Sequence, residues 1–106
     1  MRILLDNCLP IRLRHHFPGH EVETALYRGW AALENGELIS AAVDGGFDVV
    51  ISIDQGHDFE RAVAGRPIVA ILFPGTQGGR LEDILPLVPK VEAALDGAAK
   101  GIVTRL

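Results

Sequence analysis

Two aspartates in this chain directly follow short apolar runs, and such positions can bring carboxylates together. Asp6 follows the apolar residues 3–5, and Asp54 follows residues 47–53, which are rich in β-branched side chains. Both runs are typical of strands buried on both faces, the usual setting of a parallel sheet. Because ligands of open α/β sheets bind outside the carboxyl ends of the strands, the two carboxylates are candidates for one site.

Glu37 is a third candidate, because we expect it in the first turn of the helix after the second strand. Three carboxylates at one edge repel one another unless a cation neutralises them, and hard oxygen ligands suit Mg²⁺ or Mn²⁺. Asp58, four residues beyond Asp54, is a candidate fourth ligand. Each acid also has an ordinary structural interpretation, as a turn residue or as a partner of a helix dipole.

The elements that must position these acids are predicted from the pattern of apolar residues. We expect strands at residues 3–5, 20–25, 47–53, 67–73 and 101–106. We expect helical segments at residues 10–17, 36–44, 59–63 and 81–95, the last interrupted by Pro86 and Pro89. Residues 20–25 alternate apolar with charged side chains, which favours the sheet edge, and Asn35 is the expected cap of the second helix. Alternating strands and helices predict a three-layer α/β/α domain with a central, mainly parallel sheet.

The bulk composition favours one globular domain over residues 1–106. Hydrophobic residues make up 48% and charged residues 23%, which excludes a disordered chain. The net charge of −4 argues against a broadly basic nucleic-acid surface, although it leaves a local one open. Cys8 is the single cysteine, so no intrachain disulfide can form, and no apolar run approaches the roughly 20 residues of a membrane span. We therefore expect a cytoplasmic protein without a membrane anchor.

Short motifs are spaced along nearly the whole chain. They are MRILLD at 1–6 with LP at 9–10, GHEV at 19–22, GEL at 36–38, FDVVISID at 47–54 and RLED at 80–83. Their order and spacing resemble the small PIN-like proteins, relatives of the PIN-domain ribonuclease toxins of bacterial toxin–antitoxin pairs. The resemblance implies a single PIN-like domain that hydrolyses RNA with the help of Mg²⁺ or Mn²⁺.

Carried over to this chain, the resemblance makes Asp6, Glu37 and Asp54 the first, second and third acids of a metal site. A bound metal would lower the pKa of a water molecule, which would attack the phosphorus. The chain departs from the family pattern at Asn7 and Gly56, where relatives often carry Glu and then Asn or Asp. The resemblance also implies a small antitoxin protein as partner and a homodimer.

Arginines are the expected contacts to an RNA backbone, because proteins hold phosphates mainly with Arg and Lys. The candidates are Arg12, Arg14, Arg28, Arg61 and Arg80. The ordinary interpretation of any one of them is a solvated surface residue.

Two alternatives to a ribonuclease remain open at this point. A non-catalytic PIN-like protein would bind RNA or a partner without cutting it. A receiver-type phosphoacceptor domain would share the length, the layers and an aspartate at a strand end. A receiver needs an acidic pair after its first strand and a lysine after a later one, whereas Asn7 follows Asp6 here and the loop after Phe73 has no lysine.

Overall fold

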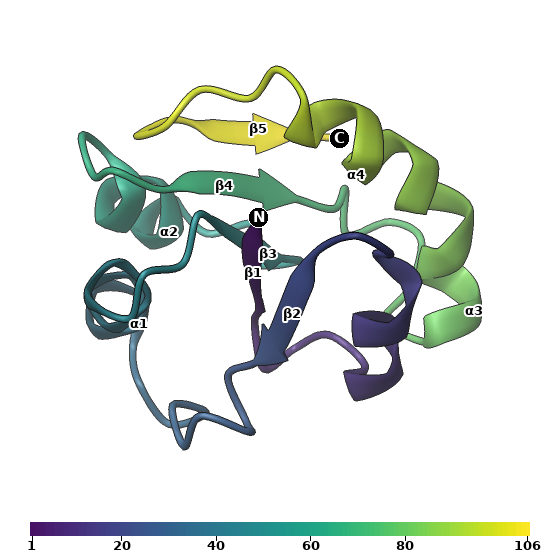
Figure 1. Cartoon of the computed structure of the whole chain (residues 1–106), viewed down its shortest axis with the longest axis horizontal. Coiled ribbons are helices and arrows are strands. Elements are labelled where there is room, and N and C mark those ends of the chain that lie inside the picture. The colour runs from purple at the N-terminus through teal and green to yellow at the C-terminus, as the bar shows by residue number, and fades with distance from the viewer.

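The computed structural model describes residues 1–106, which form a five-stranded sheet with helices on both faces (Figure 1). The strands are β1 (Arg2–Leu5), β2 (Glu21–Thr24), β3 (Val49–Ser52), β4 (Val69–Leu72) and β5 (Val103–Arg105). They are arranged in the order β2-β1-β3-β4-β5, and every neighbouring pair is parallel. The predicted α/β class and parallel sheet are confirmed, and β2 lies at an edge as its alternation predicted.

Short helical segments connect the strands. They are η1 (Ile11–His16), α1 (Asn35–Asp44), α2 (His57–Val63), α3 (Leu81–Ile84), η2 (Leu85–Leu87) and α4 (Val88–Leu95). The predicted interruption of the last helix is confirmed, because Pro86 lies in the 3₁₀ turn η2 between α3 and α4. A proline has no backbone N–H to donate, so a continuous helix cannot pass through it without loss of a hydrogen bond. None of these helices has the length and apolar character needed to cross a membrane.

Alternate residues of each central strand enter two separate cores. In β1, Ile3 and Leu5 pack on one face of the sheet, whereas Leu4 packs on the other. The first core is completed by residues of η1, α3 and α4, and the second by residues of α1 and α2. Side chains of a strand alternate between the faces, so a run that is apolar at every position must be covered twice. The predicted three layers follow from this pattern.

The strand order creates one position at which the two halves of the sheet diverge. The chain runs from β1 to the edge strand β2, and then crosses over β1 to reach β3 on its other side. This order is one of the two common orders of doubly wound sheets, and its switch point lies between β1 and β3. A ligand of such a sheet is expected in the crevice outside the carboxyl ends of these two strands.

Candidate functional site

Asp6 and Asp54 lie at the switch point. Leu5 pairs with Ile51 across β1 and β3, and the backbone N–H of Asp6 donates to the carbonyl of Ile51 at 2.9 Å. Asp54 follows β3 by two residues. Because β1 and β3 are neighbours, both aspartates lie at the same edge of the sheet. Both residues are half-exposed, so their carboxylates are open to solvent.

The hydroxyl of Ser52 connects the two aspartates. Its Oγ donates to Oδ2 of Asp6 at 2.7 Å and accepts the backbone N–H of Asp54 at 3.1 Å. Ser52 is fully buried, and Thr24 is the only other buried polar residue of the chain. A buried hydroxyl is costly unless it is hydrogen-bonded, so these bonds hold the aspartates in a defined arrangement. Our sequence analysis missed Ser52, although a lone hydroxyl in an apolar strand was a usable signal.

Every carboxylate oxygen of the pair has a donor from the protein. Oδ1 of Asp6 accepts the backbone N–H of Asn7 at 2.7 Å, and Oδ1 of Asp54 accepts that of Gly56 at 2.8 Å. Oδ2 of Asp54 accepts the side-chain amide of Asn35 at 3.1 Å. An ionised carboxylate has about four acceptor positions, so each oxygen retains capacity for a further ligand. No Lys, Arg or His forms an ion pair with either aspartate.

Glu37 points back to its own helix instead of joining the pair. Its Oε1 accepts the backbone N–H of Glu34 at 3.2 Å, as the third residue of a helix does in a capping box. The predicted cap was wrong by one residue, because Glu34 is the N-cap and Asn35 is the first residue of α1. The structure therefore presents the amide of Asn35, and not the carboxylate of Glu37, to Asp54.

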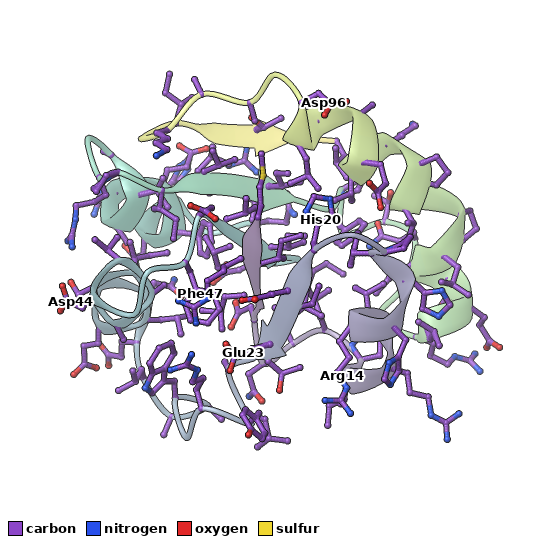
Figure 2. All side chains as sticks on the ribbon, in the orientation of Figure 1. Arg14, His20, Glu23, Asp44, Phe47 and Asp96 are labelled. Carbon is purple, nitrogen blue, oxygen red and sulfur yellow. The ribbon has the colours of Figure 1, made fainter.

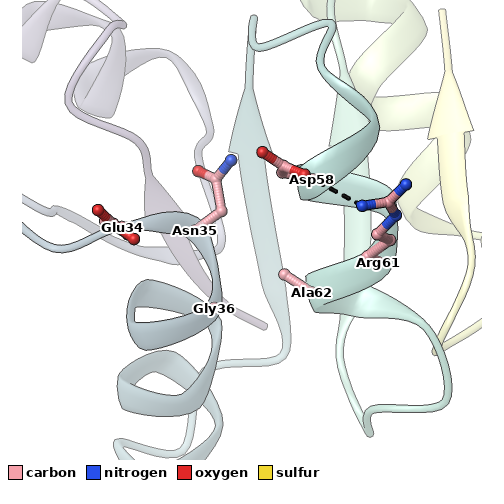
Figure 3. Close-up of a pocket in the computed structure, with 6 residues that line it drawn as sticks. All are labelled: Glu34, Asn35, Gly36, Asp58, Arg61 and Ala62. Carbon is pink, nitrogen blue, oxygen red and sulfur yellow. Dashed lines mark ion pairs between the residues drawn. The ribbon is translucent and has the colours of Figure 1, made fainter.

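Asp58 lies in the first turn of α2, where it is exposed and pairs with Arg61 at 3.6 Å. Figure 3 shows Asp58 and Asn35 pointing toward each other from the starts of α2 and α1. They line a shallow depression together with Glu34, Gly36, Arg61 and Ala62. The chain contains no group of three or more His, Cys, Asp or Glu residues placed to hold a metal ion. The four predicted acids are thus an aspartate pair with two separate neighbours.

Arg28 is occupied by contacts within the fold. Its Nε and Nη2 donate to Glu23 at 2.9 and 2.8 Å, and its guanidinium lies 5.4 Å from the ring centre of Trp30 and 5.1 Å from that of Phe47. The hydrogen bonds from Arg28, with a further one from Arg2, hold the pKa of Glu23 below its usual value. These contacts anchor the loop after β2, so they leave Arg28 a structural role.

The other candidate arginines differ in whether they have acidic partners. Arg61 pairs with Asp58, and Arg80 lies 3.0 Å from Glu82. Arg12 and Arg14 are exposed on η1 and form no ion pair. Of the five predicted phosphate contacts, these two have the freest charge.

Cys8 lies beside the aspartate pair but is not prepared as a nucleophile. Its Sγ is 3.5 Å from the Oγ of Ser52. Cys8 is exposed as a residue, but partial desolvation of its thiol, assisted by the negative charge of Asp6, raises its pKa. The thiol is therefore protonated at neutral pH, whereas the thiolate is the nucleophilic form.

Comparisons with protein-family models, with curated proteins and with solved structures found no match. Receiver domains share this strand order, so the order leaves the receiver alternative open. The residues argue against a receiver, since Asn7 stands where a receiver needs a second acid and residues 73–80 contain no lysine.

The aspartate pair suits Mg²⁺ or Mn²⁺, since such ions take one or two carboxylates and complete their shell with water and substrate phosphates.

Proposed function

We propose that this chain is a metal-dependent ribonuclease that binds Mg²⁺ or Mn²⁺ through Asp6 and Asp54. The observation that carries the proposal is the aspartate pair itself, two carboxylates at adjacent strand ends without any cationic partner. Ser52 connects the carboxylate of Asp6 to the backbone N–H of Asp54. When bound, the metal supplies a Lewis acid and an activated water molecule, which are the requirements of phosphodiester hydrolysis. The PIN-like resemblance of the sequence supports the same activity.

The residues around the pair have separable roles in this proposal. Ser52 orients the carboxylate of Asp6, and Asn35 orients that of Asp54. Both aspartates are half-exposed at an open edge, so a polymer can reach them without entering an enclosed pocket. Hydrolysis by water needs no protein nucleophile, which agrees with the raised pKa of Cys8.

We further propose that the protein acts in the cytoplasm as the toxin of a toxin–antitoxin pair, in which a small antitoxin neutralises it. This part rests on the resemblance alone, as does the proposal of a homodimer. Co-purification with the product of a neighbouring short reading frame, and loss of RNA cleavage in that complex, would support it. An unchanged cleavage rate in the complex would contradict it.

The test of the nuclease is a Mn²⁺ titration by calorimetry, followed by RNA cleavage at saturating metal. We expect the wild-type chain to bind Mn²⁺ and cleave RNA, and both Asp6→Asn and Asp54→Asn to lose binding and cleavage. Asp44→Asn is the matched control, because Asp44 is exposed at the far end of α1, and it should change neither. Failure of the wild-type chain to bind Mn²⁺, or binding that ignores both site substitutions, would refute the proposal.

A second candidate function is a non-catalytic PIN-like protein that binds RNA without cutting it. The specific observation in its favour is that Glu37 caps α1 while the neutral Asn35 faces Asp54, which leaves two carboxylates where the resemblance implies three. Metal binding without cleavage by the wild-type chain would favour this candidate. Asn35→Asp would then restore a third carboxylate, and we expect it to tighten Mn²⁺ binding. Unchanged affinity would mean that position 35 does not contribute to the metal site.

A further inference from the structure

The exposed face of η1 carries positive charge that nothing in the fold neutralises. A 3₁₀-helix has three residues per turn, and Leu13 is buried in the core, so Arg12, Arg14 and His15 are turned outward. Residues 7–20 contain no Asp or Glu, although the whole chain has a net charge of −4. Arg12 and Arg14 have no ion-pair partner. Figure 2 shows Arg14 extending from η1 away from the body of the protein.

Tyr27 presents an aromatic ring to solvent on a well-anchored turn. Its side chain is 76% exposed, the largest value among the exposed large hydrophobic residues, and the adjacent Leu26 is 53% exposed. The backbone N–H of Tyr27 donates to the hydroxyl of Thr24 at 3.1 Å, and that of Trp30 donates to the carbonyl of Ala25 at 2.8 Å. The turn is thus held by hydrogen bonds, so a planar ligand could stack on Tyr27 without first ordering the loop.

Both features lie on the side of the sheet edge next to Asp6. Leu5 pairs with Thr24, and its carbonyl accepts the backbone N–H of Ala25 at 2.9 Å, so the Tyr27 turn begins beside the strand end that carries Asp6. The segment η1 follows Asp6 in the chain and packs against β2. In Figure 1, η1 and the loop after β2 lie on opposite sides of the end of β2.

We infer that a single-stranded nucleic acid crosses this side of the edge, with phosphates on Arg12 and Arg14 and a base stacked on Tyr27. Proteins hold phosphates with Arg, and the bases of single strands stack on exposed aromatic rings. A duplex keeps its bases inside the helix, so Tyr27 selects for unpaired segments. The inference rests on the proposed function, because it gives the path by which the substrate reaches Asp6. Arg12 and Arg14 have no carboxylate partner within the fold. This uncompensated positive charge favours a polyanion over a protein as the ligand.

The experiment measures binding without cleavage. The full chain is titrated, in EDTA, against a fluorescently labelled single-stranded RNA of about 12 nucleotides, and the anisotropy is followed at several salt concentrations. We expect Tyr27→Ala to weaken binding about 10-fold, within the range for loss of one stacked base, and Tyr27→Phe to retain binding because it keeps the ring. The corresponding RNA duplex should bind equally to the wild-type chain and to Tyr27→Ala.

The double variant Arg12→Gln/Arg14→Gln tests the phosphate contacts. Each phosphate neutralised on a single strand contributes about 0.7 to the slope of log affinity against log salt, so this variant should lower the slope by about 1.4. The matched control is Lys90→Gln/Lys100→Gln, which removes two exposed lysines without ion pairs, one on α4 and one in the loop before β5, and should leave the slope unchanged.

The outcomes separate this inference from the proposed function. The inference is overturned if Tyr27→Ala leaves the RNA affinity unchanged, or if the wild-type chain does not bind the probe. It is also overturned if the control variant loses as much RNA affinity as Arg12→Gln/Arg14→Gln. Unchanged RNA affinity would also be the result if Tyr27 served a protein partner. Because the assay contains no metal, binding that depends on Tyr27 supports the inference even if Asp6 and Asp54 prove unable to support cleavage.

Discussion

Ser52 links the two aspartates through a single buried hydroxyl, and its removal tests how the pair is held. In Ser52→Ala, Oδ2 of Asp6 loses its donor and the backbone N–H of Asp54 loses its acceptor. The strand itself should survive, because alanine fits the space of serine and the adjoining Ile51 stays buried. The effect should therefore be confined to the free energy of unfolding and to the site.

The expected loss of stability follows from the charge of the acceptor. A hydrogen bond to an ionised group contributes about 1.5–3 kcal/mol net, and water can replace part of it because Asp6 and Asp54 are half-exposed. We expect Ser52→Ala to lower the free energy of unfolding by about 2 kcal/mol. At about 4 °C per kcal/mol for a domain near 100 residues, the Tm falls by about 8 °C.

Urea unfolding at neutral pH, with linear extrapolation to water, measures this change. The control is Ser40→Ala on α1. It removes a half-buried hydroxyl that accepts a hydrogen bond from Nη1 of Arg66 at 3.2 Å. That change should stay within about 0.5 kcal/mol, as for most partly exposed positions. If Ser52→Ala costs no more than Ser40→Ala, the bridge does not hold the aspartates. On the proposed metal site, the loss of this supporting bond should also weaken Mn²⁺ binding about 10- to 100-fold.

Three further predictions concern other parts of the fold. Arg28 holds the pKa of Glu23 below its usual 4.5, so the stability from ionised Glu23 is present above that pH and is lost as the pH falls through the lowered value. Glu23→Gln should flatten the curve of Tm against pH in this acidic range, and parallel curves for variant and wild type would contradict the ion pair. Gly46 has φ of +79°, a left-handed conformation that costs other residues about 1–2 kcal/mol, so Gly46→Ala should destabilise by that amount in urea. Gly36 lies on α1 and has open space where a Cβ would stand, so Gly36→Ala should instead stabilise the fold by up to about 1 kcal/mol. If Gly46→Ala and Gly36→Ala changed the free energy of unfolding in the same direction, this reasoning would be wrong. Cys8 is exposed, but partial desolvation raises the pKa of its thiol. Iodoacetamide should therefore alkylate the folded chain more slowly than the urea-unfolded chain at mildly alkaline pH, and equal rates by mass spectrometry would exclude the effect.

The parts of the fold that depend on local pattern were predictable from the sequence. Residues 3–5 and 47–53 are apolar at nearly every position, which requires cover on both faces, and the structure buries both runs in two cores. The alternation of residues 20–25 correctly predicted an edge strand. Pro86 correctly predicted a broken last helix, because a missing N–H acts within one turn. In these cases, the deciding signal is the pattern of residue types within a few positions along the chain.

The geometry of the candidate site depended on the tertiary structure. Glu37 lies in the first turn of α1 as predicted, but its carboxylate accepts the backbone N–H of Glu34, and the amide of Asn35 reaches Asp54 instead. Asn35 and Asp54 are 19 residues apart, so their contact depends on how α1 packs beside the end of β3.

Partners distant in the sequence could not be read from local pattern either. Ser52 and Asp6 are 46 residues apart, and they meet only because β1 and β3 are neighbours in the sheet. The sequence by itself determined which residues form strands, helices and core, since backbone preference and hydrophobic periodicity are local. Only the tertiary structure decided which carboxylates share an edge and which arginines remain free, since those outcomes depend on the order of the strands.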